Sequence, residues 1–131
     1  MPLDLDSQFA LHGRALQVAS QRLKLLADNI ANADTPGFKA RDIDFGTALR
    51  EAGEQQLPLS VSRPNHLASP ANPAAARVQY RVPEQPSLDG NTVDSQKESA
   101  AVAETAVRYQ ATLSFLNARI RGLRLAITGG R

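Results

Sequence analysis

The chain has 131 residues and a mass of 14.1 kDa, a length that one domain usually occupies. It is 42% hydrophobic and 21% charged, which excludes a purely disordered chain, and no apolar run reaches the roughly 18 residues of a membrane-spanning helix. The absence of cysteine excludes disulfides and thiol catalysis, and a formal net charge of +2 is too weak to indicate nucleic acid binding. Because Asp4 and Asp6 stand where a secretory signal carries positive charge, we expect no cleaved signal peptide.

The first predicted element is a long helix over about residues 5–33. Its apolar residues recur in alternating steps of four and three, a heptad seam in which the only polar member is a histidine. The seam consists of Leu5, Phe9, His12, Leu16, Ala19, Leu23, Leu26 and Ile30. The helix should be roughly 40 Å long. We expect it to end at residues 34–37, because Pro36 disfavours a helical Thr35 and Gly37 permits a turn.

The middle of the chain, residues 38–90, contains six of the eight prolines and is too long for an ordinary loop. A short helix is predicted near residues 45–52. Apolar and polar residues alternate over residues 57–62 and 77–82, which is typical of strands. We therefore expect a small β-ribbon or extended arm, partly disordered in the isolated chain.

The last predicted element is a second long helix, roughly 50 Å in length, over about residues 94–128. Its heptad seam consists of Val102, Ala106, Tyr109, Leu113, Leu116, Ile120, Leu123 and Ile127. Ser95 and Glu98 fit a capping box near its start, and Gly129 with Gly130 should stop it.

The fold class predicted from these elements is mainly α. The two long terminal helices pair as a coiled-coil-like bundle, and the proline-rich middle is irregular with short β-strands. The strict seam spacing favours a left-handed supercoil. We divide the chain into residues 1–37 and 91–131, the two halves of a helical domain, and the middle segment 38–90. Whether the helices pair within one chain or between chains stays open.

Each helix carries apolar surface outside its seam. The first has a further stripe, interrupted at Arg22, and the last has a face of small residues. Alanine is also simply the best helix former, but small residues let neighbouring helices approach closely. We interpret these residues as inter-subunit faces: Leu11, Val18 and Leu25 on the first helix, Ala111, Ala118 and Gly122 on the last. The isolated chain should then be only partly helical.

No catalytic, cofactor or metal site is predicted, since phosphate-binding, nucleophile and zinc motifs are absent from the sequence. Asp42 and Asp44 fit a solvated turn or a helix N-cap better than an acid–base pair. Residues 89–94 lack the residue order of a calcium loop and read as a turn followed by a helix cap. We interpret His12 as a seam residue and His66 as a solvated loop residue. The C-terminal arginines suit a helix end better than nucleic acid.

The segment at residues 26–38, LADNIANADTPGF, resembles the N-terminal motif of the axial proteins of the bacterial flagellum. In that family an Asn-Ile-Ala-Asn core is followed by Thr-Pro-Gly and an aromatic residue. The matching residues here are Asn29, Ile30, Ala31, Asn32, Thr35, Pro36, Gly37 and Phe38. Residues 39–45 and 80–94 are similar to the small proximal-rod subunits in particular, and residues 57–77 match only loosely.

The resemblance implies a structural subunit of the proximal rod, the periplasmic drive shaft that transmits torque and is required for motility. It implies, as partners, copies of the same chain, other rod subunits, the membrane (MS) ring with its rod adaptor, and the type III export apparatus. It implies no cofactor, nucleic acid or small-molecule substrate. The terminal helices would pack into the inner tube of the rod.

The resemblance also assigns roles to the motif. Asn29 and Asn32 could cap helix carbonyls or bond a neighbouring subunit, Pro36 and Gly37 redirect the chain, and Phe38 packs back as an anchor. Two alternatives are another small proximal-rod subunit and a soluble coiled-coil adaptor or export chaperone, which should be a stable folded dimer. An enzyme is disfavoured because the sequence shows no convergent polar cluster.

Overall fold

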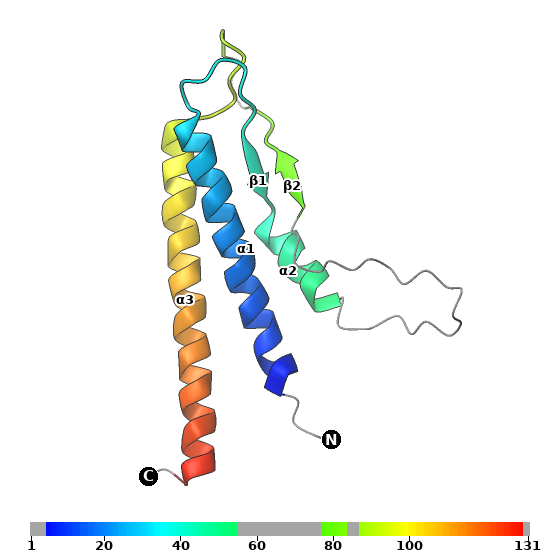
Figure 1. The fold of residues 1–131 in the computed structure, drawn as a ribbon, viewed down its shortest axis with the longest axis vertical. Helices are drawn as coiled ribbons and strands as arrows, with labels where there is room; N and C mark the ends of the chain where they lie inside the picture. The colour runs from blue at the N-terminus through cyan, green and yellow to red at the C-terminus, as the bar shows by residue number, and fades with distance from the viewer. Residues whose placement is uncertain (1–4, 55–76, 84–86, 130–131) are drawn as a thin grey trace, which may run out of the picture.

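The structure, a computed structural model, describes residues 5–54, 77–83 and 87–129. Along this part of the chain the elements follow in the order α1 (Leu5–Ala31), β1 (Arg41–Ile43), α2 (Phe45–Glu54), β2 (Val78–Tyr80) and α3 (Ser95–Thr128). Figure 1 shows α1 and α3 side by side and antiparallel, so the two long helices pair within one chain. The mainly α fold predicted from the sequence is confirmed. No helix in the described ranges is both long and apolar enough to cross a bilayer.

The ends of the long helices follow local chemistry. Asp94 is the N-cap of α3, and its carboxylate accepts hydrogen bonds from the backbone N–H groups of Gln96 and Lys97. Gly129 ends α3 in the left-handed region at φ 66°, as predicted, and Gly37 adopts φ 72° in the turn after α1. The predicted capping box is wrong, because Asp94 is the cap and the Glu98 side chain is fully buried instead.

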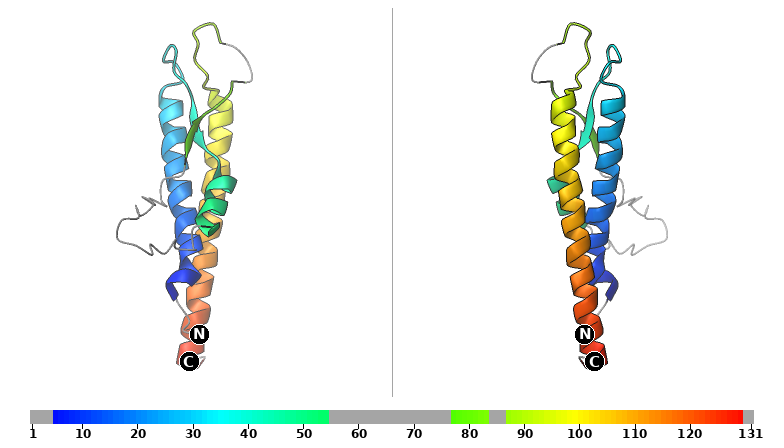
Figure 2. Two further views of the ribbon diagram at one scale, coloured as in Figure 1. Left: turned by 90° about the vertical axis from the view of Figure 1, so that its right-hand side faces the viewer. Right: turned by 90° about the vertical axis from the view of Figure 1, so that its left-hand side faces the viewer.

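The β-ribbon and α2 lie along one side of the helix pair, whose opposite side no described residue covers (Figure 2). β1 pairs antiparallel with β2, with Ile43 opposite Val78 and Arg41 opposite Tyr80. The strand predicted within residues 77–82 and the short helix near residues 45–52 are both confirmed. The partner strand is Arg41–Ile43, where a turn was expected; the predictions for residues 57–62 and His66 fall outside the described residues.

The apolar core lies between α1 and the elements that fold back over it. Val18, Ile43 and Ala48 form a buried cluster, and Leu25 and Phe45 pack against it. The prediction that Val18 and Leu25 form an inter-subunit face is therefore wrong, because β1 and α2 of the same chain cover that stripe of α1. Leu11, from the same stripe, stays exposed.

The residues predicted to form the seam of α1 are buried only in part. Leu26 and Ala19 are buried and Phe9, Leu16 and Leu23 are partly buried, whereas Ile30 is 39% exposed at the last turn. Ile30 is thus not a seam residue of this helix pair, because it lies where the chain turns away. The side chain of Leu5 lies outside the described residues.

The residues predicted to form the seam of α3 are partly buried at some positions and exposed at others. Val102, Tyr109, Leu113, Leu116 and Leu123 are partly buried. Ala106, Ile120 and Ile127 are exposed and are therefore wrong as members of a seam between the chain's own helices.

Two physical reasons account for the exposure of Ala106 and Ile127. Thr105 takes the buried position beside Ala106, because its hydroxyl donates to the carbonyl of Ala101 at 2.7 Å and is satisfied within its own helix. Farther along, α3 has 34 residues against 27 in α1, so its end extends about 10 Å past the partner helix. Ile127 lies on that extension, where α1 has nothing to cover it.

Replacing Leu26 by alanine should lower the free energy of unfolding by about 2–5 kcal/mol, because the side chain is fully buried and its removal leaves a cavity. Ile30→Ala, one turn later and 39% exposed, is the matched control and should change stability by less than about 1 kcal/mol. Urea unfolding followed by far-UV circular dichroism measures both values. Equal losses for the two variants would contradict this placement of the core.

Candidate functional site

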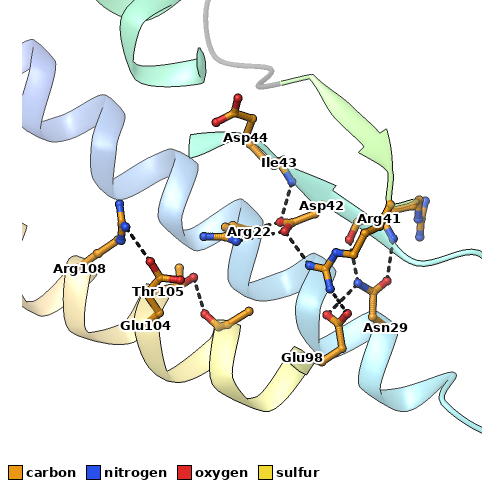
Figure 3. A network of polar contacts seen from close by, with 12 residues as sticks. Arg22, Asn29, Arg41, Asp42, Ile43, Asp44, Glu98, Glu104, Thr105 and Arg108 are labelled. Carbon is orange, nitrogen blue, oxygen red and sulfur yellow. Dashed lines mark hydrogen bonds and ion pairs between the residues drawn. The ribbon is translucent and has the colours of Figure 1, made fainter. Parts of the chain in front are cut away.

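Five polar side chains from separate parts of the sequence converge where the ribbon meets the helix pair. Figure 3 shows Arg22 and Asn29 from α1, Asp42 from β1 and Glu98 from α3 in this polar cluster. Its fifth member is Arg81, just after β2. The expectation that no polar cluster converges was therefore wrong. The cluster connects every described element of the fold except α2.

The charges in the polar cluster balance, because two arginines form a chain of ion pairs with two carboxylates. Arg22 binds Asp42 with two parallel hydrogen bonds of 2.9 and 3.1 Å, the bidentate geometry that suits a guanidinium and a carboxylate. Arg81 bridges the two carboxylates, donating to Asp42 at 2.7 Å and to Glu98 through its other terminal nitrogen. Two arginines thus neutralise two carboxylates at the centre of the fold.

Asn29 attaches the ribbon to α1 by imitating a neighbouring strand. Its amide nitrogen donates to the carbonyl of Arg41 at 2.8 Å, and its amide oxygen accepts from the N–H of Arg41 at 3.0 Å. The same nitrogen donates to Glu98 at 3.1 Å. Asn29 is fully buried, so in the single chain it holds β1 in place and neither caps α1 nor is available to a neighbour.

Burial is matched by hydrogen bonding throughout the polar cluster. Glu98 is fully buried, yet no buried side-chain nitrogen or oxygen in the described residues lacks a partner. Burial pushes the pKa of Asp42 upward, but the bonds from Arg22, Arg81 and the backbone of Ile43 outweigh it and leave that pKa below its ordinary value. The bond to Asp42 raises the pKa of Arg22.

The four charged members of the polar cluster resemble ordinary surface charges when the sequence is read alone, whereas Asn29 belongs to the rod-type motif. Glu98 was assigned to a capping box and Asp42 to a solvated turn. One signal was present, since Arg22 interrupts an otherwise apolar stripe and therefore needs a buried anion opposite it. Asp44, two residues after Asp42, does cap a helix, accepting from the N–H groups of Gly46 and Thr47.

A second group of contacts, the junction clasp, holds the turn after α1 against residues 87–94. Asn91 is its centre, because its amide nitrogen donates to the carbonyls of Asn32, Ala33 and Thr35 at 3.0, 2.7 and 3.0 Å. These carbonyls belong to the turn that follows α1, and those of Asn32 and Thr35 also accept backbone hydrogen bonds from Thr35 and Phe38. Asn32 caps the carbonyl of Asp28 at 2.8 Å, so its expected capping role is confirmed.

Backbone contacts complete the junction clasp. Gly37 donates to the carbonyl of Asp89 at 2.9 Å, and the N–H of Thr92 donates to the carbonyl of Phe38 at 3.0 Å. Gly90 adopts φ 72°, and a Cβ added to it would lie 3.8 Å from the Cα of Gly37. Two turns with left-handed glycines therefore pack directly against each other.

The remaining motif residues lie on the surface of the junction clasp. Ile30, Ala31, Thr35, Pro36 and Gly37 are exposed, and Phe38 is partly buried.

The contacts of the polar cluster and of the junction clasp hold elements of the fold together. Within the described residues no three His, Cys, Asp or Glu side chains gather in a way that could hold a metal ion. Asp89 accepts from the N–H of Asn91 and Asp94 caps α3, so the interpretation of residues 89–94 as a turn and a cap is confirmed. The carboxylates of the polar cluster are committed to arginines.

Comparison with known proteins agrees with this geometry. The sequence family described as "Flagella basal body rod protein" matches residues 10–39, which contain most of α1 and the turn motif. The chain is 46% identical to the flagellar basal body rod protein FlgB of Aeromonas hydrophila, over 98% of both chains. It is 40% identical to FlgB of Escherichia coli strain K12, over 96% of both chains. The chain belongs to the FlgB family of flagellar rod proteins.

FlgB of Cereibacter sphaeroides is a further relative, 46% identical over 93% of this chain and 94% of its own. The resemblance inferred from residues 26–38 is confirmed by these matches. Membership of the FlgB family supports a structural rod subunit over a soluble coiled-coil adaptor or an export chaperone. The polar cluster and the junction clasp are then structural features of a FlgB-family chain, whose named relatives are flagellar basal body rod proteins.

Asp42→Asn should destabilise the chain by about 1–3 kcal/mol at neutral pH, because both arginines lose their shared anion. The folded pKa of Asp42 is depressed, so its contribution to stability is present above the unfolded pKa and is lost as the pH falls through the folded pKa. The variant and the parent should therefore converge in stability at acid pH. Unfolding curves across a pH series test this, with Asp34→Asn, outside the cluster, as the control; a gap that persists in acid would contradict it.

Asn91→Asp should loosen the junction clasp, since a carboxylate cannot donate to the three carbonyls that Asn91 now binds. We expect a loss of about 1–3 kcal/mol and faster amide hydrogen exchange at residues 32–37. The same change at exposed Asn117, in the middle of α3, should alter neither. Unchanged exchange at residues 32–37 in the Asn91 variant would refute the capping role.

Proposed function

We propose that this chain is a structural subunit of the proximal part of the flagellar rod and works by assembling with its own copies and with other rod subunits. The observation that carries the proposal is a sequence identity of 40–46% with FlgB proteins over 93–98% of this chain. We also propose the finer features that the resemblance implies. These are a periplasmic position, contact with the MS ring and its rod adaptor, and export through the type III apparatus without a cleaved signal.

The exposed apolar residues of α3 support assembly. Val107, Phe115, Leu125 and Ile127 are each more than half exposed, and they lie on several sides of the helix. A helix that is apolar on several sides is normally buried by neighbours. Because α1 covers only one side of α3, further subunits are needed to cover the rest.

The small residues of α3 support close contact with those neighbours. Ala111, Ala118 and Gly122 are exposed, and a Cβ added to Gly122 would meet no atom within 4 Å. The chain's own fold therefore does not require glycine there, although glycine weakens a helix by about 1 kcal/mol relative to alanine. We propose that this face of α3, together with Leu11 on α1, receives a neighbouring helix.

The rod-type motif divides into two sets of residues on this proposal. Asn29 and Asn32 act inside the chain through the polar cluster and the helix cap. Ile30, Ala31, Thr35 and Pro36 are exposed, and we propose that they contact the next subunits in the rod. The polar cluster would transmit torque between the ribbon and the helix pair, because its hydrogen bonds connect the ribbon to Glu98 of α3.

The gene should be required for the rod. Deleting it in frame in the source bacterium should abolish swimming and leave membrane rings without a rod, as imaged by electron cryotomography. Restoring the gene should restore both. Normal rods in the deletion strain, with no duplicate gene present, would refute the assignment.

Phe115→Asp should abolish swimming while leaving the isolated chain's helical content unchanged, because the ring is 66% exposed in the single chain. Asn117→Asp places the same carboxylate two residues away on the exposed surface of α3 and should retain motility. Soft-agar swimming and circular dichroism report the two properties. A swimming Phe115 variant would show that this part of α3 is not covered in the rod.

A further inference from the structure

The ribbon has one open edge, on the outer side of β2. Within the described residues the sheet contains two strands, and β1 lies between α1 and β2 (Figure 1). The outer edge of β1 is occupied by Asn29, whose amide pairs with both backbone groups of Arg41. No described residue forms hydrogen bonds with the outer edge of β2, so this edge is able to accept a further strand.

The backbone groups at the open edge belong to Val78 and Tyr80. In an antiparallel pair, the backbone groups of successive residues point alternately toward the partner strand and away from it. The N–H of Arg81 donates to the carbonyl of Ala40 at 2.9 Å, so Arg81 and, two residues earlier, Gln79 face β1. The N–H and C=O groups of Val78 and Tyr80 therefore point away from β1.

The same segment exposes apolar side chains. Val78, Tyr80 and Val82 are 50%, 73% and 83% exposed, and as alternate residues of an extended segment they share one face. Natural proteins usually cover an apolar edge strand or protect it with charge. A further strand would bury these side chains beside its own apolar residues, as cross-strand pairs do elsewhere in sheets.

The charge beside the open edge is positive. Arg41 lies directly opposite Tyr80, and Arg77 directly precedes β2. Neither guanidinium forms an ion pair with a described residue. Residues 55–76, which precede Arg77 in the sequence, contain no acidic residue. A partner that carries carboxylates is therefore complementary to this edge, whereas the adjoining segment of the chain itself is not.

A hollow of about 410 Å³ lies beside the open edge, between the ribbon and α3. Gln79 and Tyr80 line it on the ribbon side, and Phe45 and Arg108 line it on the other. The guanidinium of Arg108 lies 5.8 Å from the centre of the Phe45 ring. The hollow provides room for the side chains that an added strand would direct toward the face of Gln79.

We propose that the open edge of β2 binds an extended segment of another protein, in which apolar and acidic residues alternate. The main chain of this segment pairs with Val78 and Tyr80, and its apolar side chains lie beside theirs. Its carboxylates lie on the other face, near Arg77 and Arg108. The inference goes beyond the proposed function, whose assembly contacts lie on α1, α3 and the turn after α1.

Amide hydrogen exchange, measured by NMR on the full-length chain, tests this contact. The probe is a short peptide of alternating valine and glutamate. We expect the amides of Val78 and Tyr80 to exchange rapidly in the chain alone and about tenfold more slowly when the peptide is saturating. The amide of Gln79 should change less, because it already faces β1.

Matched probes and variants separate charge from backbone pairing. A peptide with lysine in place of glutamate should bind about tenfold more weakly, and Arg77→Glu should weaken the glutamate peptide similarly. Arg124→Glu, near the end of α3, is the control and should not. Tyr80→Pro removes an outward N–H without removing a hydrogen bond to β1, and it should abolish the protection of Val78.

Four outcomes would overturn the proposal. Two are unchanged exchange of Val78 and Tyr80 at saturating peptide, and equal binding of the lysine peptide. The third is slow exchange of both amides in the chain alone at every protein concentration, which would show that the chain covers its own edge. The fourth is exchange that slows as the protein concentration rises, which would assign the edge to a second copy.

Discussion

The burial of the Glu98 carboxylate is the constraint on which the rest of the fold depends. A buried charge is costly unless it is paired and hydrogen-bonded, and Glu98 obtains its partners only when Arg81 and Asn29 are both in place. Arg81 arrives with the ribbon and Asn29 lies on α1. The helix pair and the ribbon must therefore form together for α3 to bury this position.

The same constraint selects the register of the helices. A heptad seam of small and apolar residues allows α3 to slip along α1 by one repeat with little change in contact. The polar cluster does not, because a slip would separate Glu98 from Asn29 and Arg81 and leave its carboxylate buried without partners. We infer that the polar cluster lowers the stability of the fold but fixes one alignment of the two helices, as buried polar residues do in coiled coils.

The sequence predicted the elements that depend on local chemistry. The 3–4 spacing predicted both long helices, and Gly37 and Gly129 marked the turn and the stop where they occur. A ribbon and its strand near residues 77–82 were predicted, but the partner strand at residues 41–43 and the polar cluster were missed because they depend on pairing at long range. Residues 41–43 show no strand alternation of their own, and they become a strand because residues 78–80 and Asn29 supply hydrogen bonds on either side.

The two halves of α3 serve different purposes, and this division links the fold to assembly. The first half buries polar residues, Glu98 and Thr105, and is fixed by the chain's own contacts. The second half exposes apolar residues and contributes little to the chain's own core. This is unusual, because the burial of apolar residues normally drives folding. On the proposed assembly, neighbouring subunits cover the exposed apolar residues of the second half. The stability of this half would then depend on the rod, and the first half of α3 would hold it in position for those contacts.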